Sequence, residues 1–216
     1  GQAIGLHKVY AGKFFGNEHK LNSFGMGYDI SDGDRIGLFA EVSGTVVDLI
    51  FLDVAVNYEG NIGNLYSAVV AARLNGGTVG NVYAIGTSVV DNGNGTLYSG
   101  AVAGEAVNAT VYDIFSIVNI KVSTTTEVYA GGIIGKSDST RLGSYTDKYN
   151  VEKVGAVFAL GRTEIVGDIV HSASAVAEGT VQADSVNVFT ITGNVYTNGK
   201  TVDKTLSDAK SEAKRS

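Results

Sequence analysis

Short segments of alternating apolar and polar residues recur along the chain, and turn-forming residues separate them. Four segments share the pattern V-x-x-[LVI]-x-x-[LIV], at residues 46–52, 79–85, 111–117 and 151–157. Their first valines are separated by 33, 32 and 40 residues. Self-similarity at a fixed period is the signature of a repeat architecture. The sequence therefore predicts a repeat of about 32 residues, with one insertion at residues 137–150 before the fourth copy.

Each repeat is interpreted as strand, corner, strand and turn. The segments are short, β-branched and contain glycine, and residues that favour helices are scarce in them. The third position of the pattern is occupied by Asp48, Asn81, Asp113 and Lys153 in turn. Asp and Asn side chains bond nearby backbone N–H groups and stabilise turns, so we expect a corner here. Solvated polar residues are the alternative, and neither interpretation implies chemistry.

Units of this kind cannot bury an apolar face alone and must stack on one another. A parallel β-helix places equivalent positions of successive coils about 4.8 Å apart. We therefore predict an all-β fold: a single-stranded parallel β-helix (solenoid) of about five to six coils over residues 1–200. A polar tail at 201–216 is expected to form a short helix or a linker. A β-sandwich also suits the strand spacing, but it predicts no self-similarity of this length.

Composition supports the solenoid and excludes several classes of protein. The 216 residues include no proline and 29 glycines. Nearly every solenoid strand lies between two others, so a residue without an N–H would break the ladder, whereas glycine suits tight corners. The net charge of −6, without a basic stripe, argues against nucleic acid as a partner. The absence of cysteine excludes disulfides and thiolate metal sites, and no apolar run approaches the ~18 residues of a membrane span. The chain starts at Gly1 and is expected to be an excised or mature segment of a longer protein.

Several segments resemble a known repeat. Residues 99–104 (SGAVAG) and 130–135 (AGGIIG) resemble the short GLUG repeat of bacterial surface proteins. Residues 10–21 are similar to the F-x-G-N-x-H-x-[IL] segment that often opens such arrays, and Ile36-Gly-Leu-Phe39 follows as in those proteins. The resemblance covers about residues 10–160. Ala68 departs from it by replacing the second glycine, and residues 170–192 hardly match, although their alternation still indicates strands.

The resemblance implies where such a chain works and what it does. In that family the arrays are extracellular β-helices of adhesins and cell-wall proteins. They also form the non-catalytic N-terminal region of streptococcal IgA1-protease-like zinc enzymes. The implied function is a non-enzymatic module of a bacterial cell-surface or secreted protein, acting as an adhesive or spacer domain without a cofactor. Its expected partners are a host protein, a glycan or neighbouring domains of the same chain. The alternatives are a structural region of a larger secreted zinc protease and a glycan-active β-helix enzyme.

No motif in the sequence assigns a catalytic, cofactor-binding or metal-binding residue. The three histidines, His7, His19 and His171, form neither H-E-x-x-H nor a pair at metal-ligand spacing. His19 lies in the opening motif, where we expect a structural role at a turn. His171 precedes Ser172, but the chain has no G-x-S-x-G elbow that would support a Ser–His pair.

Two acidic, turn-like segments, 28–35 and 91–96, superficially suggest calcium. A calcium loop of the EF type needs a glutamate at its twelfth position, where the second segment has Val102. We therefore interpret both segments as turns. Residues 108–110 fit an N-glycosylation acceptor, which has no meaning in a bacterial protein.

Two rows of side chains are expected to stack along the solenoid. Asp48 and Asp113 would lie two coils apart, roughly 9–10 Å, a separation that overlaps the range of inverting glycosidases. A role in forming the corner explains why aspartate occupies both positions, and no catalytic role is needed. Tyr66, Tyr98 and Tyr129 each precede a coil, so a stacked ladder within the structure is favoured over a binding platform.

Overall fold

The computed structural model describes Ile4, residues 8–27 and 34–166, and the backbone of five later strands. Strands joined by turns and short irregular segments make up this part of the chain, which contains no helix. The strands are β1 (Lys13–Phe15), β2 (Lys20–Asn22), β3 (Gly25–Met26), β4 (Arg35–Ile36), β5 (Phe39–Val42), β6 (Thr45–Glu59), β7 (Asn64–Ser67), β8 (Ala71–Asn75), β9 (Thr78–Asp91), β10 (Thr96–Ser99), β11 (Ala103–Val107), β12 (Thr110–Ser123), β13 (Glu127–Gly131), β14 (Ile134–Leu142), β15 (Ser144–Thr146), β16 (Glu152–Val154), β17 (Val157–Ala159), β18 (Thr163–Val166), β19 (Val170–Ser174), β20 (Ala177–Val181), β21 (Val188–Thr190), β22 (Val195–Thr197) and β23 (Lys200–Thr201).

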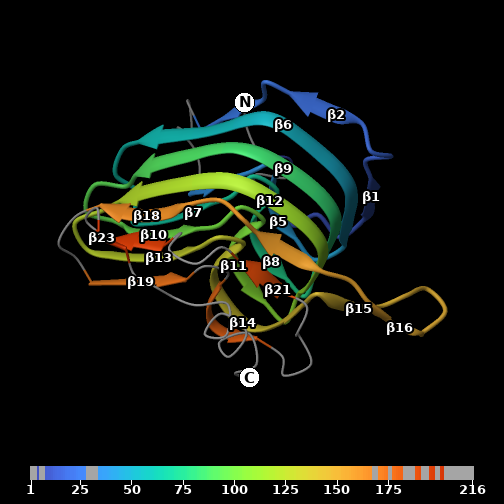
Figure 1. Ribbon diagram of the computed structural model, residues 1–216. Coiled ribbons are helices and arrows are strands. Elements are labelled where there is room, and N and C mark those ends of the chain that lie inside the picture. The colour runs from blue at the N-terminus through green and yellow to red at the C-terminus, as the bar shows by residue number, and fades with distance from the viewer. Residues whose placement is uncertain are drawn as a thin grey trace.

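The chain winds into a parallel β-solenoid with three faces, as predicted. One face has the strand order β4-β7-β10-β13-β19, and a second has β5-β8-β11-β14-β20. The third contains β6, β9 and β12, the long curved strands that lie side by side in Figure 1, with β1, β2 and β3 on one side and β17 and β18 on the other. The long strand β14 pairs with both β11 and β12 and so connects two faces.

The solenoid has about four turns, fewer than the five to six coils expected. A complete turn places a strand on each face, as β7, β8 and β9 do. The short strands β1 to β3 extend the third face only, and β19 to β22 are separated by residues outside the described set. The tail predicted at 201–216 lies outside the described residues, apart from Thr201 at the end of β23.

The register of the long strands confirms the first three copies of the repeat. Val46 pairs with Val79, and Val79 with Val111. The first spacing is 33 rather than 32 residues because β6 contains a bulge between Leu52 and Val54. Asp53, the extra residue, adopts a positive φ of 60°. An extra residue in one strand of a pair is how a β-bulge arises.

The fourth copy of the repeat lies elsewhere than the sequence pattern indicated. Val111 pairs with Leu142, and Ile114 pairs with Val157, so residues 143–156 are the insertion rather than 137–150. Within it β15 and β16 form an antiparallel hairpin, which projects from the solenoid in Figure 1. Val154, which the pattern placed in the core, is 81% exposed on this hairpin.

The corner predicted at the third pattern position is confirmed. Asp48, Asn81 and Asp113 have φ values of 66°, 52° and 51°. Asp and Asn tolerate this left-handed region better than other residues with a side chain, because their short polar groups bond locally. The backbone therefore turns at the same place in three successive strands. Apolar side chains on either side of the corner, such as Val46 and Leu49, point into the buried core.

Candidate functional site

The histidines lie apart from any catalytic arrangement that the structure describes. His19 is exposed and follows the turn formed by Asn17 and Glu18, both with positive φ. His19 thus lies at a turn, as expected, and a structural role of its side chain stays a prediction. His171 lies in β19, whose backbone alone is described, and His7 lies outside the described residues. Among the described residues, no group of three His, Cys, Asp or Glu side chains is placed to hold a metal ion. No helix in that part of the chain is long and apolar enough to cross a membrane.

The corner carboxylates are held by hydrogen bonds between turns. The Asn81 side-chain amide donates to Asp48 Oδ1 at 2.8 Å, and the Ala156 backbone N–H donates to Asp113 Oδ1 at 3.2 Å. Lys153, predicted to continue this row, pairs instead with Tyr145 in the hairpin, because the fourth copy is displaced. The first bond ties the corner of β6 to that of β9, and the second ties the corner of β12 to the end of the insertion.

The segment 91–96 is a turn built around a buried amide. The Gly93 N–H donates to Asp91 Oδ1 at 2.8 Å. The side chain of Asn92 is fully buried; its Oδ1 accepts the Ile62 N–H at 2.8 Å, and its Nδ2 donates to the carbonyl oxygens of Ile62 and Thr96 at 2.7 and 3.0 Å. The polar groups that suggested a calcium loop thus satisfy the backbone. The segment 28–33 of the other acidic run lies outside the described residues.

The predicted tyrosine ladder is present. The ring centroids of Tyr66 and Tyr98 are 4.7 Å apart and those of Tyr98 and Tyr129 are 5.1 Å apart, with interplanar angles of 15° in both pairs. Burial, followed by the neighbouring Tyr66 and Glu105, raises the pKa of Tyr98 to about 12. The rings stack on one another, as expected for a ladder that stabilises successive turns.

A row of alternating charges, which the sequence analysis missed, lies beside this ladder. Glu41, Arg73, Glu105 and Lys136 pair in register across β5, β8, β11 and β14. Arg73 forms ion pairs with Glu41 at 3.7 Å and with Glu105 at 2.8 Å. Its guanidinium also lies 5.1 Å from the Tyr66 ring centroid. The signal that could have revealed this row is a charged residue seven positions after each ladder tyrosine.

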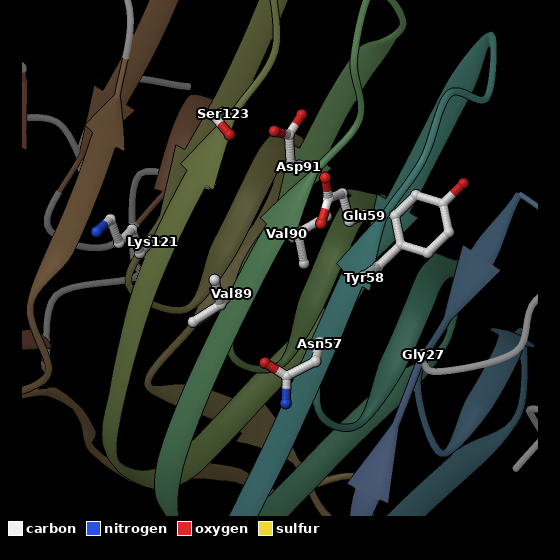
Figure 2. A pocket seen from close by; sticks show the side chains of 9 residues that line it. All are labelled: Gly27, Asn57, Tyr58, Glu59, Val89, Val90, Asp91, Lys121 and Ser123. Carbon is white, nitrogen blue, oxygen red and sulfur yellow. The ribbon is translucent and has the colours of Figure 1, made fainter.

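A hollow of about 610 Å³ lies where β6, β9 and β12 end (Figure 2). Glu59 pairs in register with Asp91, and Asp91 with Ser123, so two carboxylates and a hydroxyl lie in one row. Val89 is 45% exposed beside them, and Lys121 lies on the next strand. Acceptors next to an ammonium group and an apolar side chain suit a polar, hydrogen-bonding ligand.

A second hollow, about 570 Å³, lies between the hairpin and the beginning of the same three strands. Arg141 anchors the hairpin: its guanidinium donates to Ser144 Oγ at 3.0 Å and forms an ion pair with Glu152. Asp147 Oδ1 accepts the backbone N–H groups of Tyr149 and Val151 at 2.8 and 2.9 Å. These two bonds, that to Val151 foremost, lower the pKa of Asp147. The hairpin is thus fixed in place over the hollow, which is called the hairpin pocket below.

The fold and these surfaces define a parallel β-solenoid repeat protein with an inserted hairpin and with hollows at both ends of its long strands. No family model, no curated protein and no solved structure matches the chain. The GLUG resemblance of residues 10–160 therefore stays a prediction.

Proposed function

We propose that this chain is a non-catalytic β-solenoid module of a bacterial cell-surface or secreted protein, where it acts as an adhesive or spacer domain. The observation that carries the proposal is the pair of side-chain rows that run from turn to turn: the ring stack of Tyr66, Tyr98 and Tyr129 and the charge row that includes Arg73. In a solenoid each repeat contacts only its neighbours, so interactions repeated between neighbours determine how rigid the rod is. A rigid rod is what a spacer needs, and its loops are available for contact with partners.

The acidic residues support a structural rather than a catalytic role. An inverting glycosidase needs one carboxylic acid that donates a proton and one carboxylate that activates water. Here Asp48 and Asp113 accept hydrogen bonds that hold the corners, and Asn81 stands between them in the row. The bacterial surface location rests on the resemblance of residues 10–160 to GLUG repeats.

Surface labelling of the source cells tests the location. Antibodies against residues 1–216 are expected to label intact cells as strongly as permeabilised ones, while antibodies against a cytoplasmic protein label only the latter. Labelling that requires permeabilisation would contradict the proposal.

Incubation with a polysaccharide panel tests the absence of catalysis. We expect no release of reducing ends from any member. Release that disappears in the Asp113→Asn variant would show that the corner row is catalytic.

A further inference from the structure

One row of outward side chains forms the floor of the hairpin pocket. Lys13, Thr45, Thr78, Thr110 and Arg141 pair in register across β1, β6, β9, β12 and β14. All five side chains line the pocket. Neighbouring parallel strands lie about 4.8 Å apart, so this row presents one polar group per turn. Figure 1 shows the hairpin β15–β16 on the same side of the solenoid as the beginnings of these long strands.

The three threonine hydroxyls of the row are available to a ligand. The threonines are half-buried, and none of the three hydroxyls has a side-chain hydrogen-bond partner among the described residues. A hydroxyl both donates and accepts, so it complements the hydroxyl groups of a sugar. The repeat distance along the row is close to the length of one pyranose unit in an extended glycan, so successive sugars meet equivalent groups.

A ring pair forms one wall of the pocket. Tyr112 lies flat over Gly80, where a Cβ atom would come within 2.2 Å of the Tyr112 ring. Tyr145 stacks on Tyr112 with 3.7 Å between centroids. The glycine therefore makes the space in which the first ring lies, and the hairpin supplies the second. Stacked rings leave little conformational freedom to lose when a ligand binds.

Two exposed aromatic side chains stand at the ends of the pocket. Phe15 is 57% exposed on β1, at one end of the row, and Tyr149 is 74% exposed on the hairpin, at the other. Exposed rings beside a polar groove present an apolar surface with few bonds to immobilise. The apolar faces of sugar rings complement such a surface.

The pocket and its hairpin are more basic than the chain as a whole. The pocket is lined by Lys13, Arg141 and Lys148 and by one carboxylate, that of Asp147, in a chain of net charge −6. The charge of Arg141 is neutralised by its ion pair with Glu152, a residue that does not line the pocket. The Lys148 ammonium lies over the Tyr149 ring, 5.0 Å from its centroid. A cation next to an aromatic ring suits a sugar that carries an acidic group.

We propose that the hairpin pocket binds an acidic oligosaccharide, one that carries carboxylate or sulfate groups, extended along the row from Lys13 to Arg141. Its hydroxyls bond to Thr45, Thr78 and Thr110, and an acidic group binds Lys148. The inference rests on the proposed function: if the module acts as an adhesive domain, acidic oligosaccharides are the class of ligand that it binds. The hairpin selects the ligand because it adds a second cation–ring pair, Lys148 over Tyr149, at the Arg141 end of the row.

Calorimetric titration of the 216-residue chain tests this assignment. The probes are a heparan sulfate hexasaccharide, with sulfate and carboxylate groups, a hyaluronan hexasaccharide, with carboxylates only, and neutral cellohexaose. We expect at least one acidic probe to bind at least tenfold more tightly than cellohexaose, and added salt to weaken that binding. The difference between the two acidic probes distinguishes sulfate from carboxylate recognition.

Matched variants locate the site. Thr78→Val removes one hydroxyl without changing the shape of the side chain and is expected to weaken binding about fivefold, the effect of one lost hydrogen bond. Lys148→Ala is expected to weaken it about tenfold, as for a charge-assisted bond. The controls Thr87→Val, on the same strand β9, and Lys20→Ala, on β2, lie outside the pocket and are expected to leave binding unchanged. If Thr78→Val fails to fold, Tyr149→Ala, at a residue that is 74% exposed, takes its place and is also expected to weaken binding.

Three outcomes would overturn the assignment: neither acidic probe binds, cellohexaose binds equally well, or the pocket variants bind as tightly as their controls. None of these outcomes contradicts the proposed function, because the module can still act as a spacer if the antibodies label intact cells. Release of reducing ends during the titration would instead contradict the non-catalytic function itself.

Discussion

Replacement of Asn92 by alanine tests how the turns of this solenoid are closed. The Asn92 side chain is fully buried and makes three hydrogen bonds to the backbone, two to Ile62 and one to Thr96. Alanine would remove all three and leave the Ile62 N–H and carbonyl without these partners. Because Ile62 belongs to the preceding turn and Thr96 to the same turn as Asn92, the loss would act both within a turn and between turns.

The size of the effect follows from the count of bonds. Each intramolecular hydrogen bond contributes about 0.5–1.5 kcal/mol net, and buried groups left unsatisfied cost more. We therefore expect Asn92→Ala to lower the free energy of unfolding by about 2–4 kcal/mol. For a chain of this size, about 3 kcal/mol corresponds to a fall in Tm of about 6–12 °C.

Thermal unfolding followed by circular dichroism, with Asn94→Ala as the matched control, measures this effect. Asn94 lies two residues further on in the same turn and is exposed, so its replacement should change the unfolding free energy by less than about 0.5 kcal/mol. Equal melting temperatures for the two variants would refute the reasoning. A rise of several degrees on addition of calcium would also refute it, since the loop would then be a metal site.

Three further predictions concern backbone contact and titration. Gly86→Ala would place a Cβ atom 2.0 Å from a backbone carbonyl oxygen of the neighbouring turn, so we expect urea unfolding to show a loss of about 1–3 kcal/mol or more. Gly63→Ala, where no atom lies within 4 Å, should show no loss; equal losses would contradict the steric argument. In an ultraviolet absorbance titration, Tyr98 should ionise near pH 12, and Tyr98→Phe should remove that step. Because its folded pKa is raised, its contribution to stability is complete below the unfolded value of about 10 and is lost as pH rises through the folded value. The pKa of Asp147 is lowered in the fold, so its contribution is present above the unfolded value of about 3.9 and is lost as pH falls through the folded value. The protection factor of the Val151 amide, the intrinsic exchange rate divided by the observed rate at the same pH, should therefore fall on acidification. Asp147→Ala, which removes the acceptor, should lower it already at neutral pH; equal protection in both proteins would contradict this.

The parts of the fold that the sequence predicted correctly depend on local backbone preference. Asp48, Asn81 and Asp113 marked the corner because Asp and Asn favour turns, and the structure has the turn there, with these residues at positive φ. The ladder of Tyr66 and Tyr98 was foreseeable because both residues occupy the same position relative to the repeat, and parallel in-register stacking brings such positions together. In both cases one residue type and its spacing determine the outcome.

The displaced fourth copy could not be predicted in this way, because pattern alone does not decide which residues pair. Val151, Val154 and Val157 fit the repeat as well as the true members do, yet the first two are exposed on the hairpin. Leu142 continues the row of Val111 instead and is fully buried. The choice depends on antiparallel pairing within the insertion and on the anchoring of Arg141 by Glu152. These contacts occur in one turn only, so the repeat pattern of the sequence cannot predict them.

The same reasoning explains why the hairpin pocket needs the insertion. A regular solenoid face repeats its side chains at each turn, so every register along a row offers a ligand nearly the same contacts. Such a row can hold an extended polymer but cannot fix where it begins. The hairpin ends the row of threonines at Arg141 and adds Lys148 and Tyr149 at that end alone. Affinity therefore comes from the repeated hydroxyls, whereas the register of the ligand comes from the hairpin. It follows that Thr78→Val should lower the affinity for every acidic oligosaccharide by a similar factor. Lys148→Ala should reduce the difference in affinity between acidic and neutral oligosaccharides.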